Sequence, residues 1–277
     1  MTTSLRGEND TRVSGQQTQQ TVNDCVTGQV IRSISMSRYQ TRNMTAPTNR
    51  SNMKGESSSE RQTSFNNIFR KHIWIGSDAI LEKYANIQSS GPGSLPANTG
   101  DVQDTLTKVI ESIKVKLNVD KIKLLDIPCG DLVWMSQYLK SRRDIEYIGV
   151  DIVGPIIDHH KKEYNETGWS FIQHDIAARP LNISADLVFS RQMLQHLSNY
   201  DTLKALQHMS QSGSKYLLTT TVPTIGKNVE LSSFLSYRFR PQNLELLPFS
   251  LAPPLCMRKD AKSFVGLWRL PLKQVSL

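Results

Sequence analysis

Three short apolar stretches of this 277-residue chain each end in an aspartate, at Asp126, Asp151 and Asp175. The intervals are 25 residues (151 − 126) and 24 residues (175 − 151), each about the length of one strand with its following helix. Strands that alternate with helices form a parallel sheet. Because the carboxyl ends of parallel strands share one edge, we expect these three carboxylates on the rim where open α/β sheets bind ligands. A single such aspartate would be explained by capping of the next helix.

Apolar runs and their spacing predict the other elements. We expect helices at 101–118, 155–164 and 200–210, with another that begins near Asp131. The expected strands are 123–128, 146–151, 169–175, 185–190, 215–221 and a last one at 264–270. The fold class predicted from this alternation is α/β, a Rossmann-like doubly wound sheet.

The composition divides the chain into a tail and one domain. Residues 1–63 are rich in Ser, Thr, Gln and Asn and almost lack aromatic residues, so we expect a disordered low-complexity tail. The domain should cover 64–277. Its expected parts are N-terminal helices and a loop (64–120), the cofactor-binding core (121–221), and an acceptor-side segment with the last strand (222–277).

The first part of this domain carries two features. Apolar residues at helical spacing between Phe65 and Trp74 predict an amphipathic helix. The loop Ser89–Pro96 contains two glycines and two prolines, which exclude a helix or strand interior. It is either a plain linker or a lid over a ligand, with Gly91 and Gly93 for close approach and Ser90 or Ser94 as hydrogen-bond donors.

Charge and composition restrict the partners. The net charge is +8, but Lys and Arg are scattered, so a nucleic-acid partner is disfavoured. No apolar run of membrane-spanning length and no secretory signal is present, and we expect a cytoplasmic protein; organellar targeting by the tail is the less favoured alternative. No HxxxH, HExxH or paired-cysteine motif predicts a metal.

The turn after the first strand reads Pro128-Cys129-Gly130-Asp131 and indicates the cofactor. The dinucleotide motif GxGxxG is missing, which disfavours a nicotinamide enzyme. A pyrophosphate requires bare backbone N–H groups and positive potential, whereas Asp126 and Asp131 provide negative charge. Two carboxylates suit a ligand with an ammonium and a sulfonium group, which is S-adenosyl-L-methionine.

Four ordered motifs then make the chain resemble class I S-adenosylmethionine-dependent methyltransferases, in a little-characterised branch. They are SGPGS (Ser90–Ser94), LLDIPCGDLVWM (Leu124–Met135), YIGVDIV (Tyr147–Val153) and DLVFSRQMLQHL (Asp186–Leu197). The resemblance covers roughly residues 65–270 and implies seven strands, the last of them antiparallel. One departure is that the family's turn has several glycines where this chain has only Gly130.

The resemblance also implies roles along the rim. The first-strand turn would border the methionine end of the cofactor, the second-strand end would hold the ribose and flank the adenine, Asp175 would read the adenine edge, and the fourth-strand end would face the sulfonium and the acceptor. The residues expected to bind the cofactor are Gly91, Gly93, Ser94, Asp126, Cys129, Gly130, Asp131, Trp134, Asp151, Ile152, Asp175, Ile176, Ser190, Arg191 and Gln192.

Two residues are candidates for the chemistry. His196 is either a general base or a packed histidine at a helix end. Arg191 either holds an anionic acceptor or makes a structural ion pair. The expected function is methyl transfer to a small-molecule or sugar-like acceptor. The alternatives are a non-catalytic cofactor-binding or regulatory module, and a methyltransferase acting on protein or nucleic acid. The oligomeric state is left open.

Overall fold

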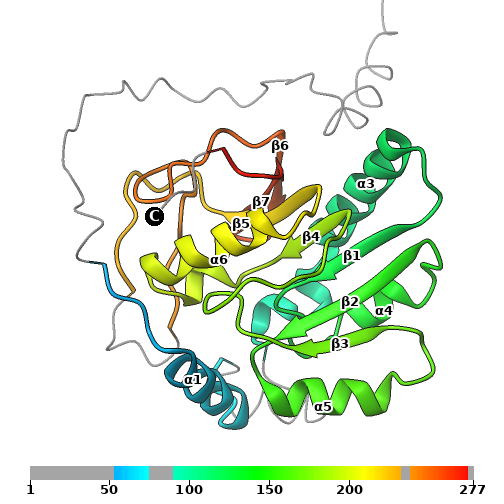
Figure 1. The fold of residues 1–277 in the computed structure, drawn as a ribbon, viewed down its shortest axis with the longest axis horizontal. Helices are drawn as coiled ribbons and strands as arrows, with labels where there is room; N and C mark the ends of the chain where they lie inside the picture. The colour runs from blue at the N-terminus through cyan, green and yellow to red at the C-terminus, as the bar shows by residue number, and fades with distance from the viewer. Residues whose placement is uncertain (1–52, 75–89, 232–237, 274–277) are drawn as a thin grey trace, which may run out of the picture.

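A computed structural model describes residues 53–74, 90–231 and 238–273 of the chain. Most of the expected tail therefore lies outside the described residues. Within them, seven strands form a single sheet in the order β3-β2-β1-β4-β5-β7-β6, with helices on both of its faces (Figure 1). This is the expected doubly wound α/β architecture.

Five strands run parallel, and all five were predicted. Their bounds are β1 Ile122–Asp126, β2 Ile145–Asp151, β3 Ser170–Gln173, β4 Leu187–Ser190 and β5 Tyr216–Thr221. The register places Asp126 beside Gly149 of β2 and Phe189 of β4. Strand β3 ends at Gln173, so Asp175 lies in the turn that follows it. The ends of β1, β2 and β4 form the centre of the rim.

The remaining two strands are antiparallel and complete the sheet. Strand β7 (Ser263–Arg269) pairs with β5, which confirms the expected last strand, and β6 (Cys256–Asp260) pairs with β7 at the edge. The sequence prediction did not locate β6. The prolines at 253 and 254 end one residue before it and give that region a loop-like composition.

The helices cover the two faces of the sheet. They are α1 (Ser58–Arg70), α3 (Gly100–Leu117), α4 (Met135–Leu139), α5 (Gly154–Glu163) and α6 (Asn199–Gln211), with short 3₁₀ turns at Pro92–Ser94, Pro96–Asn98 and Leu194–His196. Successive β1 residues point to opposite faces: Leu124 joins the core that contains α3, and Leu125 joins the core that contains α1 and α6. Two apolar cores thus fix the sheet between its helices.

Two helix starts differ from expectation. Helix α4 begins at Met135 rather than near Asp131, because Gly130 and Leu132 have φ values of 56° and 58°, which a right-handed helix does not allow. Helix α1 begins at Ser58, before the expected boundary at Ser64. Ser57 caps it, and the side chain of Glu60 accepts from the Ser57 backbone N–H in return.

Candidate functional site

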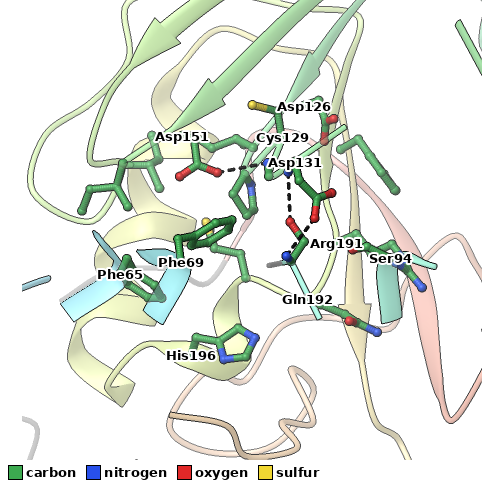
Figure 2. A pocket seen from close by; sticks show the side chains of 18 of the residues that line it. Phe65, Phe69, Ser94, Asp126, Cys129, Asp131, Asp151, Arg191, Gln192 and His196 are labelled. Carbon is green, nitrogen blue, oxygen red and sulfur yellow. Dashed lines mark hydrogen bonds between the residues drawn. The ribbon is translucent and has the colours of Figure 1, made fainter. Parts of the chain in front are cut away.

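The three aspartates that end predicted strands line one cavity at the rim of the sheet. Asp126 and Asp151 come from the ends of β1 and β2, and Asp175 comes from the turn after β3. Figure 2 shows the cavity with Asp151 and Asp126 on its sheet side and His196 opposite them. The geometric expectation of a shared rim site therefore holds.

The turn after β1 forms the floor of this cavity. Gly130 has a φ of 56°, and a Cβ atom there would lie 2.5 Å from the hydroxyl oxygen of Ser90, so only glycine fits. The Gly130 N–H donates to Asp151 Oδ2 at 3.0 Å, and its carbonyl accepts from His160 Nε2 at 2.7 Å. Asp151 Oδ1 accepts from the N–H of Val153 at 2.9 Å. One carboxylate thus connects the β1 turn to the β2 turn.

The loop at residues 90–94 is tied onto this floor. The Ser90 N–H donates to Asp131 Oδ2 at 2.8 Å, and the Asp131 N–H donates to the Ser90 hydroxyl at 2.9 Å. Arg191 Nη1 donates to the Gly93 carbonyl at 2.9 Å. Ser90 and Ser94 line the cavity, while Gly91 and Gly93 are not among its lining residues. Of the two interpretations left open, a cover attached to the β1 turn fits these contacts and a free linker does not.

The carboxyl groups of the floor carry raised pKa values. Burial raises the pKa of Asp126 to about 8; the Tyr147 hydroxyl, which donates to it at 2.8 Å, opposes the shift, and the nearby charge of Asp151 adds to it. Burial also raises the pKa of Asp151 to about 6 and that of Asp131 to about 6, against the backbone N–H groups that donate to each. The cavity therefore gains by receiving positive charge.

Arg191 makes the structural ion pair, one of its two predicted roles. Its Nε and Nη2 atoms donate to the two carboxylate oxygens of Asp260 on β6, both at 2.8 Å. Asp260 is fully buried, and the Arg191 guanidinium lies 5.9 Å from the ring of Trp134. A bidentate pair with a buried carboxylate holds the guanidinium in one orientation.

His196 borders the cavity from the side opposite the sheet. Its Nδ1 donates to the Arg238 carbonyl at 2.5 Å, which leaves Nε2 as the acceptor of the neutral ring. Its ring lies 4.6 Å from the ring of Trp74. The pKa of His196 is lowered to about 4, mainly by burial and also by the charges of Arg238 and Arg240, against the hydrogen bond to the Arg238 carbonyl, so the ring is neutral at pH 7.

Most of the other predicted residues also line the cavity. The list comprises Cys129, Trp134, Ile152, Ile176 and Gln192. Ser190 is an exception: it is fully buried in β4, is not among the lining residues, and its hydroxyl has no hydrogen-bond partner in the described part of the chain. The expected contact of Ser190 with a sulfonium therefore does not follow from this position.

Helix α1 supplies a wall that was not predicted as part of the site. Arg61, Phe65 and Phe69 are spaced four residues apart, lie on one face of α1, and line the cavity with Trp74. The sequence predicts the aromatic face of this helix but leaves Arg61 in the tail. The capping box Ser57-x-x-Glu60 was the signal that would have placed Arg61 in the first turn of a helix.

A comparison with protein-family models matches residues 124–212 to one described as a methyltransferase domain. The match covers β1 to the end of α6, the part of the fold that forms the cavity floor. A comparison with curated proteins gave no match. Among the described residues, no helix is both long and apolar enough to cross a bilayer.

Three of the solved structures to which this chain is similar are methyltransferases. Magnesium protoporphyrin IX methyltransferase from Synechocystis PCC 6803, with bound SAM, is 14% identical over 77% of this chain and 96% of its own, with a TM-score of 0.47. The 1,6-didemethyltoxoflavin-N1-methyltransferase of Burkholderia thailandensis is 13% identical over 78% and 91%, with a TM-score of 0.49. The N-methyltransferase NodS of Bradyrhizobium japonicum WM9 is 12% identical over 74% and 99%, with a TM-score of 0.45.

Proposed function

We propose that this chain is a class I S-adenosylmethionine-dependent methyltransferase that transfers the methyl group to a small-molecule acceptor, with the matched methyltransferase domain at 124–212 as its core. The observation that carries the proposal is the ring of carboxylates around Gly130. Asp126, Asp131 and Asp151 surround one turn in the cavity, and burial disfavours their ionised forms. A ligand with an ammonium and a sulfonium group compensates these charges.

The residues present fit such a cofactor. The floor exposes no cluster of bare N–H groups for a pyrophosphate, because the Gly130 and Asp131 N–H groups already donate to Asp151 and Ser90. Asp126 has a single hydrogen-bond donor, Tyr147, among the described residues and keeps further lone pairs for an ammonium group. Asp151, at the end of β2, is placed to accept from ribose hydroxyls.

When bound, the cofactor supplies an activated methyl group, and the protein must align the acceptor with it and exclude water. We assign this task to His196, on the side of the cavity opposite the sheet. His196 holds its Nε2 lone pair at the cavity with Nδ1 fixed by the Arg238 carbonyl. Nε2 would take the proton of an acceptor hydroxyl or amine as the nucleophile attacks.

A small-molecule acceptor follows from the shape and lining of the cavity. The cavity is covered by α1 on one side and by the loop at 90–94 on the other, which suits a small ligand better than a macromolecular chain. The aromatic residues Phe65, Phe69 and Trp74 favour an acceptor with apolar or planar parts. The scattered basic residues provide no tract that would follow a nucleic-acid backbone.

Two measurements test the proposal. Isothermal titration with S-adenosylmethionine should show binding, and absence of binding at millimolar cofactor would refute it. Incubation with methyl-labelled cofactor and fractionated cell extract should then transfer the label to a low-molecular-weight fraction. His196→Ala should retain cofactor binding and lose transfer; label appearing only in protein or nucleic acid would refute the small-molecule acceptor.

A further inference from the structure

Asp175 is fully occupied by the protein. Its Oδ2 accepts from Nε and Nη2 of Arg61 at 3.0 and 2.9 Å, and its Oδ1 accepts from the N–H groups of Ala177 and Ala178 at 3.0 and 3.3 Å. A carboxylate offers about four lone-pair sites, so these four donors use them all. An adenine amino group could reach Asp175 only by displacing one of them.

Displacing Arg61 would carry a large cost. Its side chain is only 3% exposed, and its Nη1 donates to Asp201 Oδ1 at 2.8 Å and to the Glu56 carbonyl. Asp201 is itself 2% exposed and lies in the first turn of α6, where Ser198 is the N-cap that accepts from the Asp201 N–H and donates to Asp201 Oδ2. Removing one partner from a buried ion pair leaves an uncompensated charge, which is strongly destabilising. Arg61 therefore belongs to a buried junction that joins α1, the β3 turn and the start of α6.

The same helix face carries aromatic rings into the cavity. Phe65 and Phe69 follow Arg61 at intervals of one helical turn and line the cavity. Phe69 also borders a groove together with Val153, two residues beyond Asp151. In Figure 2 both rings lie on the side of Asp151, away from Arg191 and Ser94. The position of α1 thus sets the aromatic wall at the β2 end of the cavity, where a ribose and its base would lie.

We propose that Asp175 is a positioning residue that anchors α1 through Arg61 and so holds the Phe65–Phe69 wall against the nucleoside, and that it does not read the adenine amino group. This inference rests on the proposed function, because it takes the ligand to be an adenosyl compound. It replaces the role that the family resemblance implied for Asp175. Selection of the nucleoside at this end of the cavity then comes from stacking on the aromatic rings and from shape, and not from a hydrogen bond to Asp175.

Two ligands distinguish whether Asp175 holds α1 or binds the adenine amino group. They are S-adenosylhomocysteine and S-inosylhomocysteine, in which a carbonyl oxygen replaces that amino group. Asp175→Asn and Arg61→Met should each raise Kd for both ligands about tenfold, because fewer molecules hold α1 in the binding position. The ratio of the two Kd values should stay as in the wild type. Arg70→Met, at the exposed end of α1, is the matched control and should change neither Kd.

Hydrogen exchange supplies a second readout. Amides of residues 58–70 should exchange faster in both Asp175→Asn and Arg61→Met, while those of β1 remain protected. A reversed ligand ratio in Asp175→Asn, or unchanged α1 exchange and unchanged affinity in Arg61→Met, would overturn the proposal. If Arg61→Met does not fold, the ligand ratio and α1 exchange of Asp175→Asn decide the question. Failure of the wild type to bind either ligand would refute the methyltransferase function itself.

Discussion

The floor and the α1 wall of the cavity are built in different ways. The floor consists of the turns that follow β1 and β2, and its hydrogen bonds link neighbouring strands, such as that between Gly130 and Asp151. The α1 wall is held by contacts between distant parts of the chain: Arg61 meets Asp175 and Asp201, which lie 114 and 140 residues away. The floor supplies negative charge, and the wall supplies a paired cation and aromatic rings.

This difference separates two kinds of contribution to binding. Changes in the floor alter the charge that meets the ligand and distort the turn that carries Gly130. Changes in the wall alter how often α1 occupies its binding position and how much apolar surface it covers. The floor should therefore govern the pH dependence and most of the affinity, whereas the wall should govern affinity without a change in its pH dependence.

The largest effect is expected in the floor, for Asp151→Asn. An asparagine has one acceptor oxygen where Asp151 accepts from both Gly130 and Val153, so its amide nitrogen would face an N–H group. Together with the lost charge, we expect a Kd for S-adenosylmethionine about 100-fold higher, or ~2.7 kcal/mol, by isothermal titration. Asp158→Asn makes the same change on the exposed side of α5 and should leave Kd unchanged. Equal effects of the two substitutions on Kd would show that the floor does not determine the affinity for the cofactor.

The pH dependence of binding should be of intermediate size. The pKa values of Asp131 and Asp151 are about 6 and that of Asp126 is about 8, so a cationic ligand must displace protons from the empty cavity at lower pH. Kd should fall about tenfold or more between pH 5.5 and 8.5. Asp126→Asn should flatten the part between pH 6 and 8. A pH-independent Kd in the wild type would contradict the charged floor.

Asp126→Asn should also change the thermal stability of the folded protein. The pKa of Asp126 is raised from 3.8 to about 8, so between these values the folded protein binds more protons than the unfolded chain. The contribution of this group to stability therefore falls as the pH rises through that window. Asp126→Asn removes the penalty and should raise Tm at pH 8 by a few degrees, with little change at pH 5. A lower Tm at pH 8 would show that the carboxylate is stabilising.

A smaller effect is expected in the wall, for Phe69→Ala. Phe69 is partly exposed, so its loss should cost less folding energy than loss of the buried Phe65, while cavity-facing ring area disappears. We expect Kd to rise about fivefold, or ~1 kcal/mol, at every pH. Asn67→Ala, on α1 but outside the cavity lining, is the control. A change in the pH profile of Phe69→Ala would contradict the division between wall and floor.

The smallest effect is expected for Ser90→Ala, where the cover meets the floor. The substitution removes the hydroxyl that accepts from the Asp131 N–H and leaves the bond from the Ser90 N–H intact. Loss of one hydrogen bond should raise Kd about threefold to fivefold. Ser112→Ala, which removes a hydroxyl bonded within α3, is the comparison. An effect as large as that of Asp151→Asn would show that the cover, not the floor, determines affinity.

The floor could be predicted from the sequence because its information is local. Asp126, Asp151 and Gly130 lie at or just after strand ends, and parallel pairing brings such ends together without knowledge of side-chain packing. The left-handed turn at Leu132 and the buried position of Ser190 could not be predicted, since neither residue type indicates them. Arg61 was missed for another reason: a polar tail composition concealed a helix start, and its partners are distant in the sequence.

The cap of α1 has a practical consequence for shortened versions of the chain. A version that starts at Ser64 would keep all four family motifs and every carboxylate of the floor, but it would lose Arg61 and the Ser57–Glu60 cap. A version that starts at residue 53 would keep both, together with the Glu56 carbonyl that Arg61 contacts. Truncation beyond Arg61 removes the anchor and leaves the four motifs intact.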